Sequence, residues 1–233
     1  MKNETVPNNS VEIENLIAKR LPVWDKLTKQ EQDQLIAATT ARSFKKGAHI
    51  HSGMDDCLGV LFLIRGSLRA YLLSDKGREI TLFHIEEGEH CVLPAECILP
   101  LITFDIFVDA LVDSDLLILS PNTFSALMEE NPVLDAFAYK QTAERFSEVM
   151  WVFNQILFVS FDIRLASYLL EEANLAGSNS ITMTHDKIAR DLGSAREVVT
   201  RMLKYFQQEG LVKLSRGVIT ILDPKGLNNL THP

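Results

Sequence analysis

The amino-acid sequence predicts an α+β protein in three parts: an N-terminal antiparallel β-barrel or jelly roll, a long helix, and a small C-terminal unit of helices with a β-hairpin. Three observations support this class. Short β-rich runs fill residues 44–119, helical periodicity continues from Pro121 to Phe158, and a compact unit with a different pattern ends the chain. The predicted domains are residues 1–120, 121–161 and 162–233.

The N-terminal part changes from helical to strand-like patterning near Phe44. Residues 11–40 are typical of short helices, and Thr28 before KQEQ predicts a capping box. Between Leu61 and Glu89, β-rich runs are separated by RGS, SDKGRE and EEGE, and each of these contains a Gly that favours a turn. Many short strands at even spacing predict an antiparallel barrel or jelly roll.

The long helix is expected from about Val133 to Phe158. Apolar positions along it recur at steps of four and three, which is the spacing of a seam between two helices. A dimer seam is the favoured interpretation, and a single buried core helix is the alternative. The residues assigned to the dimer interface are Thr142, Arg145, Val149, Val152 and Ile156. The stretch VSFDIR then ends the pattern, with Asp162 expected to cap the next helix.

A helix-turn-helix is predicted within residues 183–223. Thr184 is placed to cap a short helix, Gly193 suits the turn, and a second helix follows from about Ala195. After Gly210, the stretch LVKLSRGVITIL is typical of a hairpin wing. An ordinary solvated helical hairpin is the alternative interpretation.

The side chains expected on the exposed start of the second helix suit a DNA major groove. Arg can bind guanine O6 and N7, Glu can accept from cytosine N4, and Thr can contact a methyl or a phosphate. Basic side chains in the hairpin can reach the DNA backbone. The predicted DNA-binding residues are Thr184, Ser194, Arg196, Glu197, Thr200, Arg201, Lys213 and Arg216.

The charge distribution agrees with a nucleic-acid partner for the C-terminal part alone. From Thr182 to the end there are 8 Lys and Arg against 5 Asp and Glu, whereas the preceding residues hold 15 against 26. The whole chain has a formal net charge of −8. The C-terminal unit can therefore face a polyanion, while the N-terminal part cannot.

Two stretches resemble the Crp/Fnr family of bacterial transcription regulators. HDKIARDLG followed by SAREVVTRMLKYF is similar to its DNA-binding domain, including an Arg-Glu-x-x-x-Arg signature at Arg196, Glu197 and Arg201. Residues 61–89 resemble its cyclic-nucleotide-binding-like effector barrel. The resemblance implies a homodimer on a near-palindromic operator, with Glu197 and Arg201 reading bases and Arg196 contacting a base or a phosphate. Thr200 lies where one branch of the family uses a Ser for base contact.

The resemblance does not extend to the phosphate site of the cyclic-nucleotide-binding members. Gly88-Glu89 matches their motif, but the second Gly-Glu appears as Ala95-Glu96, and the Arg-Ser or Arg-Thr pair as Phe104-Asp105. An Asp repels a phosphate, and a Phe supplies no charge to bind one. We therefore expect an effector that is not a cyclic nucleotide, and its identity stays open.

The residues assigned to an effector pocket or a redox site are Cys91, Cys97, Glu96 and Asp105. The two cysteines could form a thiol switch, bind a metal, trap an electrophile, or serve as small buried hydrophobic residues. Haem ligation by His84 or His90 is a further alternative. Three cysteines in the chain are one short of the usual four ligands of an iron-sulfur cluster. The sequence identifies no particular cofactor.

A cupin-like metalloenzyme is the alternative from a different class. His49 and His51, followed by Asp55 and Asp56, are faintly similar to the cupin metal motif, but its Glu is missing. We expect no enzyme activity and no metal site. No apolar run reaches the roughly 18 residues of a membrane span, so a cytoplasmic location and no membrane partner are expected. RNA polymerase is kept as a candidate partner.

Overall fold

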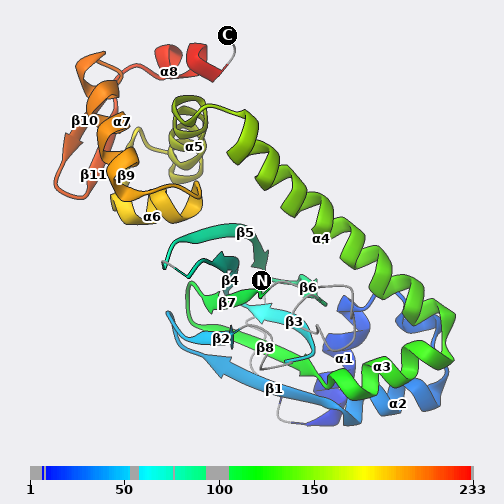
Figure 1. The fold of residues 1–233 in the computed structure, drawn as a ribbon. Helices are drawn as coiled ribbons and strands as arrows, with labels where there is room; N and C mark the ends of the chain where they lie inside the picture. Colours follow the sequence, from blue (N-terminus) through cyan, green and yellow to red (C-terminus); the bar gives the residue numbers. More distant parts are fainter. Residues whose placement is uncertain (1–6, 8, 53–57, 76, 93–104, 232–233) are drawn as a thin grey trace. The chain divides into compact units, whose positions relative to one another are not determined.

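The computed structural model describes residues 7, 9–52, 58–75, 77–92 and 105–231 (Figure 1). Two compact units make up the chain. The first comprises Met1–Leu73 and Leu82–Val149, and the second comprises Ser74–Thr81 and Met150–Pro233. Among the helices of the described residues, none is long and apolar enough to cross a membrane.

The first unit contains two four-stranded sheets with strand orders β1-β8-β3-β6 and β2-β7-β4-β5. The pairs β1 with β8, β3 with β8 and β4 with β7 are antiparallel. This arrangement confirms the predicted jelly roll, although the strands of the described residues form two sheets and not one closed barrel. The strands are β1 (Thr39–Phe44), β2 (His49–Ser52), β3 (Val60–Arg65), β4 (Ser67–Leu73), β5 (Glu79–Glu86), β6 (His90–Cys91), β7 (Phe107–Ala110) and β8 (Ser114–Leu119).

Local hydrogen bonds define the helices of the first unit, which are α1 (Ser10–Arg20), η1 (Trp24–Lys26), α2 (Lys29–Ala37) and α3 (Pro121–Glu130). Before α2, the Thr28 side chain accepts from the Glu31 backbone N–H at 3.3 Å, and the Glu31 carboxylate accepts from the Thr28 N–H at 2.6 Å. The predicted capping box is therefore present. Pro121 occupies the first turn of α3, as the sequence predicts.

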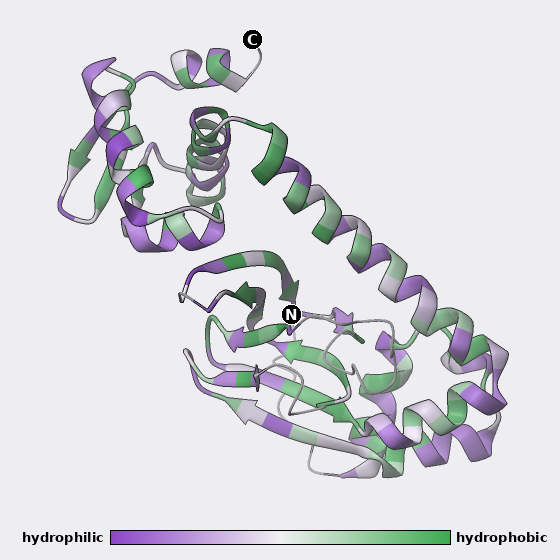
Figure 2. Ribbon diagram, in the orientation of Figure 1, coloured by the Kyte–Doolittle hydropathy of each residue, from purple (hydrophilic) through white to green (hydrophobic). Residues whose placement is uncertain are grey.

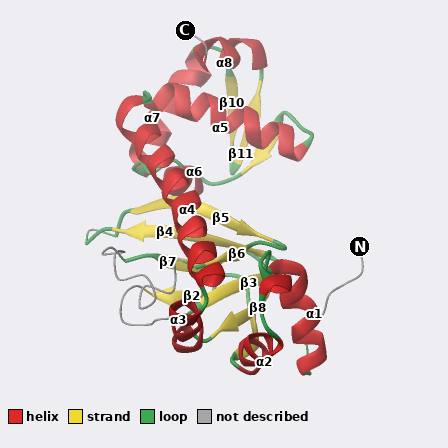
Figure 3. Ribbon diagram, turned by 90° about the vertical axis from the view of Figure 1, so that its right-hand side faces the viewer, coloured by secondary structure: helices red, strands yellow, loops and turns green. Residues whose placement is uncertain are grey.

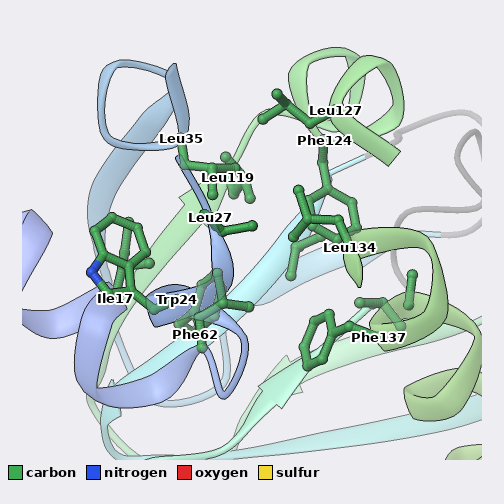
Figure 4. Packing of buried hydrophobic residues seen from close by; sticks show 14 of the residues in the cluster. Ile17, Trp24, Leu27, Leu35, Phe62, Leu119, Phe124, Leu127, Leu134 and Phe137 are labelled. Carbon is green, nitrogen blue, oxygen red and sulfur yellow. The ribbon is translucent and has the colours of Figure 1, made fainter. Parts of the chain in front are cut away.

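The core of the first unit lies where these helices pack on the strands β3 and β8 (Figures 3 and 4). Side chains from both sheet and helices are almost completely buried there, so these helices are part of the hydrophobic core of the first unit. The cluster shown in Figure 4 includes Ile17, Trp24, Leu27, Leu35, Phe62, Leu119, Phe124, Leu127, Leu134 and Phe137.

Helix α4 (Pro132–Phe158) confirms the predicted long helix and has 27 residues. The next helix, α5 (Phe161–Ala176), begins after Ser160, whose extended backbone makes it the N-cap residue. The predicted cap at Asp162 is therefore wrong. Asp162 lies inside the first turn, where its carboxylate interacts favourably with the helix dipole.

The second unit combines helices with a three-stranded sheet of order β10-β11-β9. The antiparallel pair β10 and β11 confirms the predicted hairpin wing. The strand β9 and the helix α8 are additions that the sequence interpretation missed. Besides α5, the elements are β9 (Ser180–Thr182), α6 (His185–Asp191), α7 (Arg196–Gln208), β10 (Val212–Ser215), β11 (Val218–Ile221) and α8 (Pro224–Thr231).

Candidate nucleic-acid interface

The helices α6 and α7 form a helix-turn-helix. The Thr184 side chain caps α6 by accepting a hydrogen bond from the backbone N–H of Lys187 at 3.1 Å. The chain then turns at Gly193, whose φ of +57° favours glycine. The backbone N–H of Ser194 donates to the Ala189 carbonyl at 2.8 Å and closes the turn. The predicted motif is confirmed, with Ser194 half-buried at the turn.

Side chains of α5 hold this turn in place. The Arg164 guanidinium donates to the Leu192 carbonyl at 2.7 Å. The Tyr168 hydroxyl donates to the Asp191 carboxylate at 2.6 Å and accepts from the Lys187 ammonium at 3.1 Å. Burial and the Asp191 charge raise the pKa of Tyr168, so this hydroxyl stays protonated as a donor. The orientation of α6 is therefore fixed by polar contacts as well as by packing.

One face of α7 is completely buried. Val199, Leu203 and Phe206 each have 0% exposure and follow one another at steps of four and three, which is the spacing of one helix face. They pack in the core of the second unit with residues from α5, α6 and the wing strands. This packing leaves the opposite face of α7 turned outward.

The outward face of α7 lines a shallow surface depression. This face includes all four residues predicted for the start of the second helix. It also includes Lys204, Tyr205 and Gln208, which the sequence interpretation missed. Each of these three residues lies four positions after another residue of the same face, and this helical spacing could have identified them from the sequence. The residues of this face are Arg196, Glu197, Thr200, Arg201, Lys204, Tyr205 and Gln208.

The charges near this face suit a polyanion. Arg196 forms an ion pair with Asp186 at 3.3 Å, but both side chains are more than half exposed, so the pair is weak. The described residues place no carboxylate within ion-pair distance of Arg201, whose side chain is exposed. On the wing, Lys213 of β10 and Arg216 of the following turn are also exposed. Their guanidinium and ammonium groups are available for phosphates or bases.

The predicted dimer-interface residues of α4 are partly covered by their own chain. The Arg145 guanidinium pairs with Glu89 at 3.3 Å and with Glu148 at 2.8 Å, and it lies 4.8 Å from the ring centroid of Phe83. Val149 is only 6% exposed. At Arg145, this side of α4 therefore packs within the first unit.

Thr142, Val152 and Ile156 are half-buried. Thr142 donates its hydroxyl hydrogen to the Ala138 carbonyl of its own helix at 2.8 Å. In the second unit, a Cβ added at Gly193 would lie 2.9 Å from Cδ1 of Ile156, so Ile156 packs against the turn between α6 and α7. These three positions therefore offer less free apolar surface than the sequence suggests.

A different stripe of α4 is largely exposed. Bands of hydrophobic residues recur along this helix in Figure 2. From Ala143 onward the stripe residues lie one position after the predicted ones, and the whole stripe keeps the steps of four and three. We call them the exposed stripe: Tyr139, Ala143, Phe146, Met150, Phe153 and Leu157.

The predicted effector residues are described only in part. Cys91 lies on β6 opposite Leu61 of β3 and is 1% exposed. Asp105 is exposed just before β7. Cys97 and Glu96 lie outside the described residues, as do Ala95 and Phe104 of the phosphate motif. The proximity of Cys91 to Cys97 therefore stays a prediction.

Arg145 and the ring of His90 lie near Cys91 in the first unit. Burial alone would lower the pKa of Arg145, but the hydrogen bond with Glu148 and the charges of Cys91 and Glu89 outweigh it and raise this pKa. The His90 ring lies between Phe137, at 5.2 Å between centroids, and Phe62, at 6.1 Å. Burial and the Arg145 charge lower the pKa of His90, which keeps the ring neutral.

The histidines of the cupin-like alternative do not share one environment. His49 is exposed and contacts Asp109 at 2.6 Å, whereas His51 is buried, and the strand register shifts between the two. Asp55 and Asp56 lie outside the described residues. Within the part of the chain that the structure describes, no group of three or more His, Cys, Asp or Glu is arranged to hold a metal.

The fold and the outward face of α7 define a winged helix-turn-helix DNA-binding protein with a jelly-roll domain. The Crp-like helix-turn-helix domain model matches residues 163–230. A crystal structure of a protein from Eubacterium rectale, described as a transcriptional regulator of the Crp/Fnr family, is 43% identical. The match covers 92% of this chain and 99% of that chain, with a TM-score of 0.85. The chain therefore belongs to the Crp/Fnr family of transcription regulators.

More distant relatives include two named regulators. Electron transport regulator A of Shewanella oneidensis is 28% identical over 223 residues, which cover 88% of this chain and 84% of that protein. The cAMP-activated global transcriptional regulator Vfr of Pseudomonas aeruginosa is 24% identical over 195 residues, which cover 77% of this chain and 88% of Vfr. Both relatives are named as regulators, and the name of Vfr gives cAMP as its activator.

Proposed function

We propose that two copies of the chain form a homodimer that binds a near-palindromic DNA operator in the cytoplasm and responds to a signal sensed in the jelly-roll domain. The observation that carries this proposal is the outward face of α7, which presents Arg, Glu and Thr side chains on a helix held rigidly by its buried face. Residues 1–120 would sense the effector, 121–161 would dimerise, and 162–233 would bind DNA.

The side chains divide into base-reading and phosphate-binding groups. Glu197 and Arg201 lie on the exposed first half of α7, where a recognition helix contacts base edges, and Arg196 is placed for a base or a phosphate. Four of the other predicted contacts suit the DNA backbone because they lie at the start of α6, at the turn and on the wing. These are Thr184, Ser194, Lys213 and Arg216.

Substitution of Arg201 tests the assignment of α7. Arg201→Ala is expected to cost about 1–3 kcal/mol at the cognate site and to relax the preference at one base pair, because a bidentate base contact is lost. Arg216→Ala is the control, since losing a phosphate contact should weaken all duplexes alike. Affinities for cognate and scrambled duplexes would be measured at one salt concentration. An unchanged ratio in Arg201→Ala would contradict the assignment.

Dimerisation through α4 is supported by the exposed stripe. An apolar seam with steps of four and three on a long helix is typical of a helix that pairs with a second copy. Large apolar side chains such as Phe146 (60% exposed) and Leu157 (69% exposed) would otherwise stay in water. We therefore place the centre of the interface on the exposed stripe, with Val152 and Ile156 at its margin.

The effector is proposed not to be a cyclic nucleotide, in contrast to that of Vfr. The support is Phe104-Asp105 in the sequence, where the family's phosphate-binding pair would stand, and the exposed carboxylate of Asp105. The chain is proposed to act by binding and not by catalysis, because its relatives are regulators. RNA polymerase remains a candidate partner for the DNA-bound dimer.

Calorimetry with cAMP and cGMP tests the effector proposal. Neither nucleotide is expected to give saturable heat, because the carboxylate of Asp105 opposes an anionic phosphate. The substitution Asp105→Arg provides a comparison, since it would remove the opposing charge. Binding of either nucleotide to the unchanged protein at micromolar concentration would overturn the proposal.

A thiol sensor is the second candidate, and the position of Arg145 favours it, because its guanidinium donates to the carbonyl of His90, the residue before Cys91, at 3.5 Å. A neighbouring guanidinium stabilises a thiolate, which is the reactive form of cysteine. DNA affinity would be compared for reduced and oxidised protein and for the variants Cys91→Ser and Cys97→Ser. An effect of oxidation that is present in the unchanged protein and absent in both variants would support this candidate. No effect of oxidation in any of them would exclude it.

A further inference from the structure

The first turn of α6 contacts the outward face of α7 through a hydrogen bond. Nδ1 of His185 lies 2.9 Å from Oγ1 of Thr200, and the pair is partly buried. His185 is the first residue of α6, directly after its cap residue Thr184. Thr200 belongs to the same outward face as Arg201. A residue of the first helix therefore reaches a side chain that lies among those proposed to read bases.

This contact restricts the conformation of Thr200. A Thr side chain in a helix divides between two rotamers, because its hydroxyl can also bond to a carbonyl of the preceding turn. The hydrogen bond to His185 favours one of the two. Since the hydroxyl and the methyl share the Cβ atom, fixing the hydroxyl also fixes the direction of the methyl. The surface that Thr200 offers to a ligand is then largely decided by His185.

The same contact restricts what the hydroxyl can do. A hydroxyl carries one donor hydrogen and two acceptor lone pairs. If Nδ1 of His185 accepts the hydroxyl hydrogen, Thr200 keeps only lone pairs for a base, which suits the amino group of adenine or cytosine. If Nδ1 donates, Thr200 keeps its hydrogen for an acceptor such as thymine O4 or guanine O6. The two arrangements favour different bases.

We propose that His185 is a specificity-determining positioning residue: it fixes the rotamer and the hydrogen-bonding role of Thr200, and thereby the base pair preferred at one position of each half-site. This inference rests on the proposed function, in which α7 enters the major groove. His185 itself need not touch a base. His185 acts on the choice of base only through Thr200. Arg201 and Glu197, in contrast, are proposed to contact bases directly.

A double-mutant cycle on the full chain tests the proposal. His185→Leu removes the hydrogen bond, Thr200→Val removes the hydroxyl at nearly constant shape, and His185→Asn keeps a polar atom near the position of Nδ1. Binding would be measured to duplexes that carry each of the four base pairs at every position of the half-site. His185→Leu is expected to change the ratio of affinities at one position by roughly three- to tenfold, the value of one hydrogen bond.

Three further results are expected. Thr200→Val changes the ratio at that same position, the double variant resembles Thr200→Val alone, and His185→Asn restores most of the original preference. A uniform loss of affinity in His185→Leu would overturn the proposal, because a purely structural role lowers binding to all duplexes alike. An equal effect of His185→Leu in the Thr200→Val background would also overturn it, since His185 would then act without Thr200.

Arg201→Ala separates failure of this inference from failure of the proposed function. If Arg201→Ala changes discrimination while His185→Leu does not, α7 reads DNA and the role of His185 is wrong. If the unchanged protein shows no preference among the duplexes, the proposed function is wrong and the inference is overturned with it.

Discussion

Replacing Phe146 with Glu is expected to leave the chain folded, to make it monomeric, and to weaken binding to a symmetric operator by roughly a hundredfold or more. The side chain is 60% exposed, so its replacement disturbs little of the chain's own packing. In a dimer, the carboxylate introduced by Phe146→Glu would lie in the apolar seam, where an unpaired charge is costly. A monomer also loses the gain from binding two linked half-sites, which reaches roughly 10²- to 10⁴-fold.

Gln155→Glu is the matched control for Phe146→Glu. It adds the same negative charge to α4 at a position outside the exposed stripe. Sedimentation would report the assembly state of both variants, and titration of an operator duplex would report binding. If Phe146→Glu stayed dimeric, the interface would have to lie elsewhere. If both variants became monomeric, added charge on α4 would be the cause, and the stripe would have no special role.

Truncating Phe206 to Ala is expected to destabilise the second unit by about 3–5 kcal/mol and to abolish DNA binding at growth temperature. Phe206 has 0% exposure, and its removal leaves a cavity in a small core that also holds Val199 and Leu203. A unit of this size has little stability to lose. The recognition helix would then lose the buried face that fixes its orientation.

Tyr205→Ala is the matched control, because it is the neighbouring aromatic residue and is 48% exposed. It is expected to change the free energy of unfolding by no more than about 0.5 kcal/mol. Thermal unfolding of the full chain, followed by circular dichroism, would compare the two variants. Equal shifts in melting temperature would contradict the assigned faces of α7.

Interactions between residues close in sequence were enough to predict several helix ends and turns. The caps at Thr28 and Thr184 are each formed by hydrogen bonds that span three residues, so the local sequence contains all the participants. Pro121 and Gly193 act through their own backbone conformations. The jelly roll could also be predicted, because it is built from many short strands separated by turns with glycine.

Features that depend on distant contacts were harder to predict. Two stripes of α4 have helix-pairing spacing, and the choice between them depends on what covers Arg145 and Val149. The structure identifies Glu89 and Phe83 of the jelly roll as two contacts of Arg145, and the sequence pattern of α4 alone contains no trace of them. The seam positions proposed from the structure therefore lie one residue after those predicted from the sequence.

The missed elements and the missed contact have related causes. The strand β9 has only three residues, Ser180–Thr182, and it is a strand because it pairs with β11. Helix α8 begins at Pro224 and contains Gly226, which weakens any helical signal. The bond between His185 and Thr200 joins residues fifteen positions apart and requires the folded turn. Each depends on tertiary structure that a sequence pattern does not contain.

Selection of duplexes from a random pool with the purified full chain tests whether the protein is a homodimer that reads DNA through α7. We expect recovery of a two-fold symmetric site, with half-site centres about one helical turn (10–10.5 base pairs) apart. We also expect that Arg201→Ala recovers sites with a relaxed base pair at the same position in both half-sites. Recovery of no common sequence, or of a single half-site without a symmetric partner, would contradict a homodimer that reads DNA through α7.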